Sequence, residues 1–523
     1  MRNLLSILFS IILVGFLLFP VRASKPLQSP ESAPSPSRGV VLFVADSLMP
    51  EALNELLREG KLKAIPFLID HGFYWDDVVS IFPSMSVVID SSLITGTYPD
   101  EHRVPALVWY DPESRRVINY GDSPRSLWKQ GPLTTLHWVL ADLNQKHLSP
   151  RVSTIHETLE RTGLRTGSIN LLVHRGPVSH HTPLFELTLK GPDLLALGPI
   201  LSEKEESGGE TFFTTNSFRD ADVWRTARRW LHRNPPPDFL IAYLSELDKK
   251  VHREGPSHRQ HLLEIDRRLS SLLSSFGSWE QALDRYIFIL MGDSGHVPVK
   301  DDEGHQIHLE EILKGFRLLP PGSRLKPDDY DWVVAPNEQL AVLYPARPSV
   351  PTLPVQRRLL KHPGIDLVMQ RDGNMITVQS RTGILRFRRG GPWTDPYGNT
   401  WTVSGNPEVL DLRIDPANKS IGYRTYPDAL RQILGAAGAQ RGPCLLVTAR
   451  TGYEFRYGTS PSHPGGGSHG SLKQREMLVP LIAGGTTVKP AHRRIVDLKA
   501  WILSLVQEEK KKPGKQTGTG TTY

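Results

Sequence analysis

Three apolar runs, each followed within a few residues by an aspartate, constrain the fold of this chain more than any other feature. They cover residues 39–45, 239–244 and 286–291. Continuous apolar and β-branched runs of this length are typical of strands in a parallel sheet that is covered on both faces. Residues 258–276, between the second and third runs, carry apolar side chains at helical spacing. This alternation predicts an α/β fold with a central mixed, mostly parallel sheet flanked by helices.

The aspartates that follow these runs are candidate ligand-binding residues. Asp46, Asp248 and Asp293 lie at or just past the predicted strand ends. In open α/β sheets, ligands bind outside the carboxyl ends of the strands. For Asp46 the alternative is a helix N-cap, because Pro50 opens a helical pattern soon after it.

The composition and the hydrophobic pattern of the sequence change between residues 301 and 442. Proline and glycine become frequent there, and short alternating segments such as 374–378 appear. We interpret this region as a β-rich insertion, a candidate cap over the substrate site. It divides the predicted core into a first part, residues 39–300, and a second part, residues 443–507.

The two ends of the chain are predicted to lie outside the fold. Residues 1–24 hold an arginine, an uncharged apolar run and small residues, the pattern of a signal peptide. An N-terminal membrane anchor remains the alternative. Residues 25–38 form a Pro/Ser-rich linker, and residues 508–523 form a charged and then Gly/Thr-rich tail. The expected location is secreted or extracytoplasmic, with possible membrane association through the N-terminal segment.

The net charge bears on the partners of this chain, and the cysteine content bears on how its fold is stabilised. The formal net charge of +7 fits either a solvated basic surface or attraction to anionic partners. The basic patches are short, so no nucleic-acid binding is expected. The single cysteine, Cys444, excludes an intramolecular disulfide, and its apolar surroundings favour a core role.

Two serines are candidate nucleophiles. Ser84 and Ser86 precede an apolar helical stretch, and the start of a helix attracts anions such as phosphate. Either serine could instead be a simple helix cap.

Histidines supply candidate metal ligands. Asp248 and His252 are four residues apart and converge on one cation if their segment is helical. His469 lies in a glycine-rich loop, and His296 follows Asp293 closely. Aspartates gathered at one sheet edge would repel each other by about 4 kcal/mol per close pair at an effective dielectric near 20. Two cations would remove that repulsion and hold both the attacking and the leaving oxygen of a displacement.

The order of these motifs resembles that of the alkaline-phosphatase superfamily, in particular its type I phosphodiesterase/nucleotide pyrophosphatase branch. The resemblance covers about residues 40–300 and 445–485. Its most specific part is the stretch 93–102, LITGTYPDEH, which is similar to the segment that follows the family nucleophile. Counting back in the family register reaches Ser86, with Ser84 as the fallback.

The resemblance implies a phosphoric ester hydrolase, either a phosphodiesterase or a phosphatase, with two divalent cations, usually zinc. One cation would be held by Asp248, His252 and His469, and the other by Asp46, Ser86 and Asp293. Ser86 would attack the phosphorus and form a phosphoserine that water hydrolyses. The implied substrate is a phosphorylated small molecule, lipid or polymer.

The chain departs from the family at one ligand. Ser294 stands where the family has histidine, and serine is a poor zinc ligand. His296 is the candidate replacement. Otherwise the second site binds a harder ion such as Mn or Mg, or is weakened.

Two rival functions remain. A sulfatase is disfavoured because Ser86 is followed by two valines rather than by the Pro and Arg needed for formylglycine maturation. The rival from another class is a non-catalytic protein that binds an anion or polymer on a decayed phosphatase fold. The missing histidine at Ser294 favours this rival, and the retention of the other ligands opposes it.

Overall fold

The structure is a computed structural model that describes residues 38–182, 187–198, 219–326 and 328–511. The predicted signal or anchor of residues 1–24, almost all of the linker 25–38 and most of the tail 508–523 lie outside the described residues. Within those ranges, no helix combines the length and the apolarity that crossing a membrane would require. The described residues belong to one unit, Ser37–Pro513.

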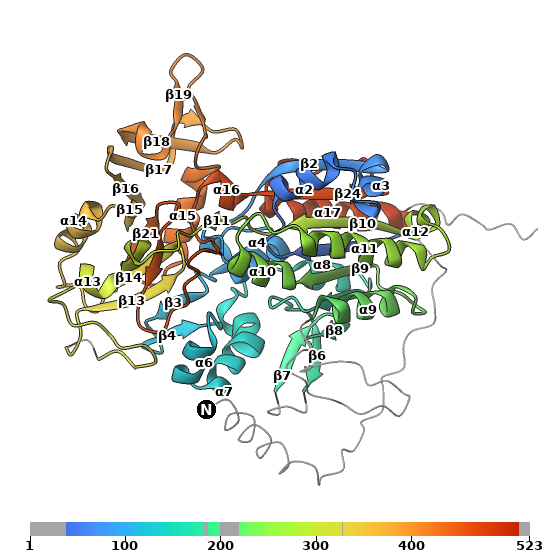
Figure 1. Cartoon of the computed structure of the whole chain (residues 1–523), viewed down its shortest axis with the longest axis horizontal. Coiled ribbons are helices and arrows are strands. Elements are labelled where there is room, and N and C mark those ends of the chain that lie inside the picture. The colour runs from blue at the N-terminus through green and yellow to red at the C-terminus, as the bar shows by residue number, and fades with distance from the viewer. Residues whose placement is uncertain (1–37, 183–186, 199–218, 327, 512–523) are drawn as a thin grey trace, which may run out of the picture. The chain divides into compact units, whose positions relative to one another are not determined.

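A seven-stranded sheet forms the centre of the first part of the fold (Figure 1). Strand β1 (Gly39–Ala45) lies in the middle and pairs in parallel with β10 (Tyr286–Gly292) on one side and β9 (Phe239–Leu244) on the other. Strand β24 is antiparallel to its two neighbours. The predicted fold class is therefore confirmed, and all three apolar runs are strands. In spatial order the strands are β2 (Gly72–Val79), β24 (Leu478–Gly484), β10 (Tyr286–Gly292), β1 (Gly39–Ala45), β9 (Phe239–Leu244), β5 (Thr166–Ile169) and β8 (Leu194–Ala196).

Alternate residues of β1 point to opposite faces of this sheet, as strand geometry requires. Val40, Leu42 and Val44 pack against one set of helices, whereas Val41 and Phe43 pack against the other. The first set is α4 (Ser86–Thr95), α8 (Ile155–Glu160) and α17 (Ile495–Lys511). The second set is α2 (Pro50–Arg58), α3 (Ala64–Asp70), α9 (Asp220–Leu231), α10 (Glu246–Glu254), α11 (Gln260–Ser274) and α12 (Trp279–Arg285). Because both faces are covered, the central strands are apolar throughout.

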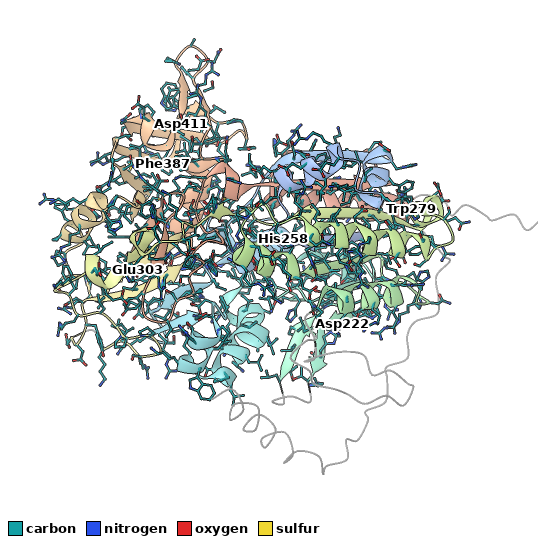
Figure 2. All side chains as sticks on the ribbon, in the orientation of Figure 1. Asp222, His258, Trp279, Glu303, Phe387 and Asp411 are labelled. Atoms are coloured by element: carbon teal, nitrogen blue, oxygen red, sulfur yellow. The ribbon has the colours of Figure 1, made fainter. Side chains whose placement is uncertain are left out.

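A nine-stranded sheet forms the second part of the fold. Phe387, labelled in Figure 2, lies on strand β17 (Gly383–Thr394) of this sheet. It is fully buried and packs edge to face on Trp401. In spatial order the strands are β13 (Trp332–Asn337), β14 (Leu340–Pro345), β21 (Leu445–Ala449), β15 (Ile365–Asp372), β16 (Met375–Ser380), β17 (Gly383–Thr394), β20 (Ser420–Gly422) and β19 (Arg413–Asp415), with β18 (Thr400–Gly405) also paired to β17. Its helices are α13 (Leu309–Ile312), α14 (Leu353–Lys361) and α15 (Ala429–Ala439).

A buried arginine joins the two parts. Arg431 on α15 is 2% exposed and donates to Asp100 and Glu101 of α5 (Pro99–His102), at 2.9 Å each. Its guanidinium also lies over the Tyr98 ring, 4.0 Å from the centroid. The second sheet is therefore tied directly to the segment that continues from α4.

Short elements complete the chain. Among them, the pairs β11–β23 and β12–β22 matter for the site. The short elements are β3 (Val108–Asp111), β4 (Arg116–Asn119), α6 (Pro124–Gln130), α7 (Pro132–His137), η1 (Trp138–His147), β6 (Val178–His181), β7 (Thr188–Gly191), β11 (Val297–Pro298), η2 (Glu303–His305), β12 (Gln306–His308), η3 (Pro407–Leu410), β22 (Glu454–Arg456), β23 (Gly467–Ser468) and α16 (Gln474–Met477).

Candidate metal centre and nucleophile

The register of the first sheet brings the predicted aspartates to one edge. Ala45, the last residue of β1, pairs with Gly292 of β10 and with Leu244 of β9. Asp46 and Asp293 therefore follow directly after neighbouring strand ends. Helix α10, which carries Asp248, begins just after the third of these strands.

Four predicted residues gather into one group, here called the histidine cluster: Asp248, His252, His296 and His469. One ligand atom of each lies within 4.8 Å of the others. The Nε2 atoms of His252 and His296 lie 3.2 and 3.3 Å from Asp248 Oδ1. Nitrogen and carboxylate ligands at this spacing suit a zinc ion. The structure thus places His296 with the first predicted set of ligands.

Backbone carbonyls orient two of these imidazoles. His252 Nδ1 donates to the carbonyl of Gly467 at 2.9 Å, and His469 Nδ1 donates to the carbonyl of Ser84. A histidine whose Nδ1 carries the proton has a free lone pair on Nε2, which is the usual arrangement of a metal-ligating histidine. His252 Nε2 lies 3.2 Å from Asp248 Oδ1, and His469 Nε2 lies 3.8 Å from Glu338 Oε1.

Local backbone structure explains why these loops meet. Strands β11 and β23 are antiparallel, with Val297 opposite Ser468, so that His296 and His469 flank the same pair. A Cβ at Gly466 would lie 1.8 Å from the carbonyl oxygen of His252. The glycine-rich loop therefore approaches α10 more closely than any residue with a side chain could.

The start of α10 is fixed by a further carboxylate. Asp220 on α9 accepts hydrogen bonds from the backbone N–H groups of Ser245 and Glu246, and it lies 2.9 Å from His261 Nε2. These contacts hold the helix that presents Asp248 and His252.

The second sheet contributes a residue that sequence reasoning missed. Glu338 lies in the turn between β13 and β14, at a φ of 58°. Its Oε1 lies 3.7 Å from His252 Nε2 and 3.8 Å from His469 Nε2. Its Oε2 accepts hydrogen bonds from Ser468 Oγ and from the backbone N–H of His469. Glu338 is therefore both a neighbouring charge and a support for the His469 loop.

A second missed residue is His463. Together with His252 and Glu338 it forms another group whose ligand atoms lie within 4.8 Å. Its ring lies 4.1 Å from the His252 ring, and its Nδ1 bonds to the buried carboxylate of Glu454 at 2.8 Å. The sequence offered a signal here, since His463 opens the same glycine-rich loop that carries His469.

Charges within the histidine cluster favour cation binding. Burial lowers the pKa of His252, but the carboxylates of Asp248 and Glu338 outweigh it and raise that pKa to about 10. Burial raises the pKa of Glu338, but the neighbouring imidazoles lower it to about 2. Burial and the charge of His469 lower the pKa of His296 to about 3. Burial raises the pKa of Asp248, but His252 and His296 outweigh it and lower that pKa well below its usual value. The carboxylates of Asp248 and Glu338 thus stay ionised, and a bound cation would replace the proton that His252 otherwise takes up.

The second predicted set is made of oxygen atoms. Asp293 Oδ1 accepts hydrogen bonds from the backbone N–H groups of Ser47 and Ser294, and its Oδ2 accepts one from the Tyr243 hydroxyl at 3.1 Å. Burial, with neighbouring carboxylates, raises the pKa of both Asp46 and Asp293. Ser294 is fully buried, and its Oγ has no hydrogen-bond partner among the described residues. Within the same part of the chain, neither Asp46 nor Asp293 belongs to a group of three or more ligand atoms that all lie within 4.8 Å of one another.

A third missed residue links the two sets. Ser47, at a φ of 65°, donates from its Oγ to Asp248 Oδ1 at 2.9 Å and lies 2.6 Å from His296 Nε2. Its backbone N–H donates to Asp293 at 3.0 Å. The turn after β1 therefore connects the histidine cluster with the oxygen set.

The two candidate nucleophiles differ in their surroundings. Ser84 is fully buried, and its Oγ accepts from the Gly470 N–H at 2.8 Å and donates to the Ser471 carbonyl at 3.2 Å. Ser86 is half-buried and is the first residue of α4. Among the described residues, its hydroxyl has no hydrogen-bond partner. Ser84 is thus occupied in holding the His469 loop, whereas Ser86 is free at a helix N-terminus.

The single cysteine has no place in this chemistry. Cys444 is buried in the core of the second sheet, and burial raises the pKa of its thiol to about 12. A thiol with such a pKa is a poor nucleophile.

Comparisons with known structures support the fold. Murine ectonucleotide pyrophosphatase/phosphodiesterase 5 is similar with a TM-score of 0.55 and 13% identity, over 90% of this chain and 95% of that one. The human protein of the same name gives the same values. Phosphonoacetate hydrolase from Sinorhizobium meliloti 1021, in complex with phosphonoacetate, is similar with a TM-score of 0.53 and 14% identity, over 90% and 96% of the two chains. No curated protein matches the sequence.

A family comparison gives the relationship. The sequence profile described as type I phosphodiesterase / nucleotide pyrophosphatase matches residues 40–351. This range includes Asp46, Ser86, the helix α10 and Asp293, and it confirms the resemblance that the motif order predicts. The chain therefore belongs to the type I phosphodiesterase/nucleotide pyrophosphatase family and is a phosphoric ester hydrolase.

Proposed function

We propose that this chain is an exported, metal-dependent phosphodiesterase that uses Ser86 as its nucleophile. The observation that carries the proposal is the histidine cluster. Its member His469 donates from Nδ1 to the backbone carbonyl of Ser84, two residues before Ser86 and its free hydroxyl. A cation site beside an unpartnered serine at a helix N-terminus is the arrangement that phosphoryl transfer to a serine requires.

The donors present fit divalent cations. Asp248, His252, His296 and His469 would hold the first one, and their mix of nitrogen and carboxylate ligands favours zinc. Asp46, Asp293 and Ser86 would hold the second. When bound, such cations neutralise the charge of the phosphoryl group and favour the ionised serine.

The residues of the chain would perform the displacement as follows. Ser86 Oγ would lose its proton to solvent and attack the phosphorus, while the bond from phosphorus to the leaving alcohol breaks. The alcohol leaves with a proton from solvent, and the phosphoryl group remains as an ester of Ser86. Water then attacks the phosphorus, the bond to Ser86 Oγ breaks, and the serine regains its proton. The backbone N–H groups at the start of α4 face the anionic group throughout.

The substrate class is proposed from the relatives and from the charge of the chain. One structural relative, an inactive variant of murine ectonucleotide pyrophosphatase/phosphodiesterase 5, is in complex with AMP, and another binds phosphonoacetate. We infer a phosphorylated small molecule, with a lipid or polymer headgroup as the alternative. The net charge of +7 supports attraction to such anions. Export is proposed from residues 1–24 alone, and retention by that segment as an anchor is the alternative.

Turnover of bis-p-nitrophenyl phosphate and p-nitrophenyl phosphate tests the proposal, with zinc or manganese added. We expect the Ser86→Ala variant to lose about a thousandfold or more in kcat/KM, because it removes the attacking atom. Ser84→Ala is the matched control. It should keep measurable turnover and lose about 2 kcal/mol of unfolding free energy, because Gly470 N–H and the Ser471 carbonyl lose their partner.

Faster turnover of bis-p-nitrophenyl phosphate would indicate a phosphodiesterase, and faster turnover of p-nitrophenyl phosphate would indicate a phosphatase. Equal activity of wild type and Ser86→Ala would refute the nucleophile. The Ser294 departure favours a non-catalytic anion-binding protein as the second candidate. That candidate predicts no turnover of either ester with any metal, and no bound zinc or manganese.

A further inference from the structure

A cleft of about 650 Å³ lies beyond the far end of the nucleophile's helix. Helix α4, ten residues or about 15 Å long, separates this cleft from Ser86. One wall is α5 and the other is the loop after η1, and the Ser149 N–H joins them by donating to the His102 carbonyl at 2.9 Å. The cleft shares no lining residue with the histidine cluster or the oxygen set. Its lining residues are Asp100, Glu101, Arg103, Ser149, Arg151 and Val152.

The two carboxylates of the cleft are already engaged. Asp100 and Glu101 each accept a hydrogen bond from the buried guanidinium of Arg431, at 2.9 Å. The other two charged residues of the lining, Arg103 and Arg151, are both cationic. An anion that enters the cleft therefore meets free positive charge and carboxylates that are tied to the protein.

Three arginines supply this positive charge. Arg103 donates from Nη1 to the Gly438 carbonyl at 2.9 Å, and Arg371 donates from Nε to the Gly373 carbonyl at 2.8 Å. A Cβ at Gly438 would lie 3.4 Å from Arg371 Nη1, so both guanidinium groups approach the same turn of α15. Arg151 is exposed at the cleft. Within the part of the chain that the structure describes, none of the three makes an ion pair.

Arg103 is held under strain beside like charges. Its φ of 69° lies in the left-handed region, which residues with a side chain rarely adopt. Strain of this kind clusters at ligand sites. Burial lowers the pKa of its guanidinium, and three neighbouring arginines lower it further, whereas Asp100 raises it. These neighbours are Arg441, Arg371 and Arg151. An anion bound among them would relieve the repulsion between these cations.

We propose that this cleft is an accessory binding site for a small molecule that carries phosphate groups, held by Arg103, Arg151 and Arg371. A guanidinium presents two parallel N–H donors to a pair of phosphate oxygens, and several of them around one cleft suit a ligand with more than one phosphate. The inference goes beyond the proposed function, because the site contains neither Ser86 nor a ligand of either cation.

The size and the rigidity of the cleft support a small-molecule ligand. Pockets that bind small molecules have volumes of about 300–1,000 Å³, and this cleft, at about 650 Å³, falls within that range. Ser149 is buried, and its Oγ accepts a hydrogen bond from the Arg151 N–H at 3.2 Å. The loop that carries Arg151 is therefore fixed before a ligand arrives, which lowers the entropy cost of binding.

Arginine modification tests the site on the unaltered chain. The full chain in mild detergent is treated with phenylglyoxal, with and without inorganic tripolyphosphate at about 1 mM, and modified arginines are mapped by mass spectrometry. We expect tripolyphosphate to slow the modification of Arg103 and Arg151 about fivefold or more. Arg225 is the internal control, since it is exposed on α9, 2.7 Å from Asp222. Unchanged rates at Arg103 and Arg151, or equal protection of Arg225, would overturn the inference.

Calorimetric titration with tripolyphosphate then counts the sites. The double variant Arg103→Gln/Arg151→Gln should bind one tripolyphosphate fewer per chain than the wild type. It should keep the wild-type turnover of bis-p-nitrophenyl phosphate, because neither residue belongs to the candidate catalytic site. The control Arg225→Gln/Arg267→Gln removes the same charge from exposed ion pairs on α9 and α11 and should bind as the wild type does.

Two outcomes of the titration count against the cleft. One is an unchanged number of sites in Arg103→Gln/Arg151→Gln, and the other is the same loss in the control variant. The proposed function is judged separately, by the loss of turnover in Ser86→Ala. A chain that binds tripolyphosphate through Arg103 and Arg151 but turns over no ester would keep this inference and refute the function.

Discussion

Glu338 offers the sharpest test of how the two sheets cooperate at the metal centre. The perturbation is Glu338→Gln, which removes one negative charge and keeps the size of the side chain. The amide oxygen of glutamine still accepts the hydrogen bonds from Ser468 and from the backbone of His469. The change therefore isolates the charge that lies 3.7 and 3.8 Å from the two imidazoles.

The magnitude follows from these distances. A unit charge at 3.7 Å interacts with another by about 4 kcal/mol at an effective dielectric near 20. Relaxation of the site and water that enters it reduce this figure, so we expect zinc binding to lose about 1.5–3 kcal/mol. That loss equals a dissociation constant raised about ten- to hundredfold.

Competition with a chromogenic chelator measures the zinc affinity. The matched control is Glu310→Gln, since Glu310 is exposed and accepts a hydrogen bond from the Gly458 N–H, outside the histidine cluster. The control should bind zinc as the wild type does. A dissociation constant for Glu338→Gln within threefold of the wild-type value would refute the reasoning, because it would mean that the second sheet adds no charge to the site.

Two further predictions concern stability. Arg431→Met should lower the unfolding free energy by about 3 kcal/mol in urea denaturation, because the carboxylates of Asp100 and Glu101 lose the two charged hydrogen bonds that the 2%-exposed guanidinium donates; a loss below 1 kcal/mol would contradict this role. His156 is fully buried, and burial lowers its pKa to about 3, so the unfolded chain binds more protons below pH 6.5 and stability is lost as the pH falls. His156→Gln should therefore reduce the loss of unfolding free energy between pH 7 and pH 5 by about 2 kcal/mol. An unchanged pH dependence in that variant would show that His156 does not contribute.

The sequence predicts the first sheet well because its strands are buried on both faces. Continuous apolar runs have few other interpretations, and β1, β9 and β10 lie where those runs lie. Their alignment also follows from the sequence, since aspartates after parallel strands must meet at one edge. The family match then confirms the order of motifs that connects these strands.

The rest of the site depends on contacts that no local pattern encodes. Glu338 reaches the histidine cluster only because the second sheet packs beside the first, and nothing around it in sequence marks a ligand. The placement of His296 depends on the pairing of β11 with β23, which joins segments far apart in the chain.

The span of the histidine cluster has a consequence for biosynthesis. Its ligands run from Asp248 to His469, and the β11–β23 pair that holds two of them forms only when the later loop is present. A nascent chain that has emerged only as far as the second sheet lacks His469, and with it the support that Glu338 gives to that loop. A cation held by the histidine cluster would therefore be bound late, after nearly the whole polypeptide has been made.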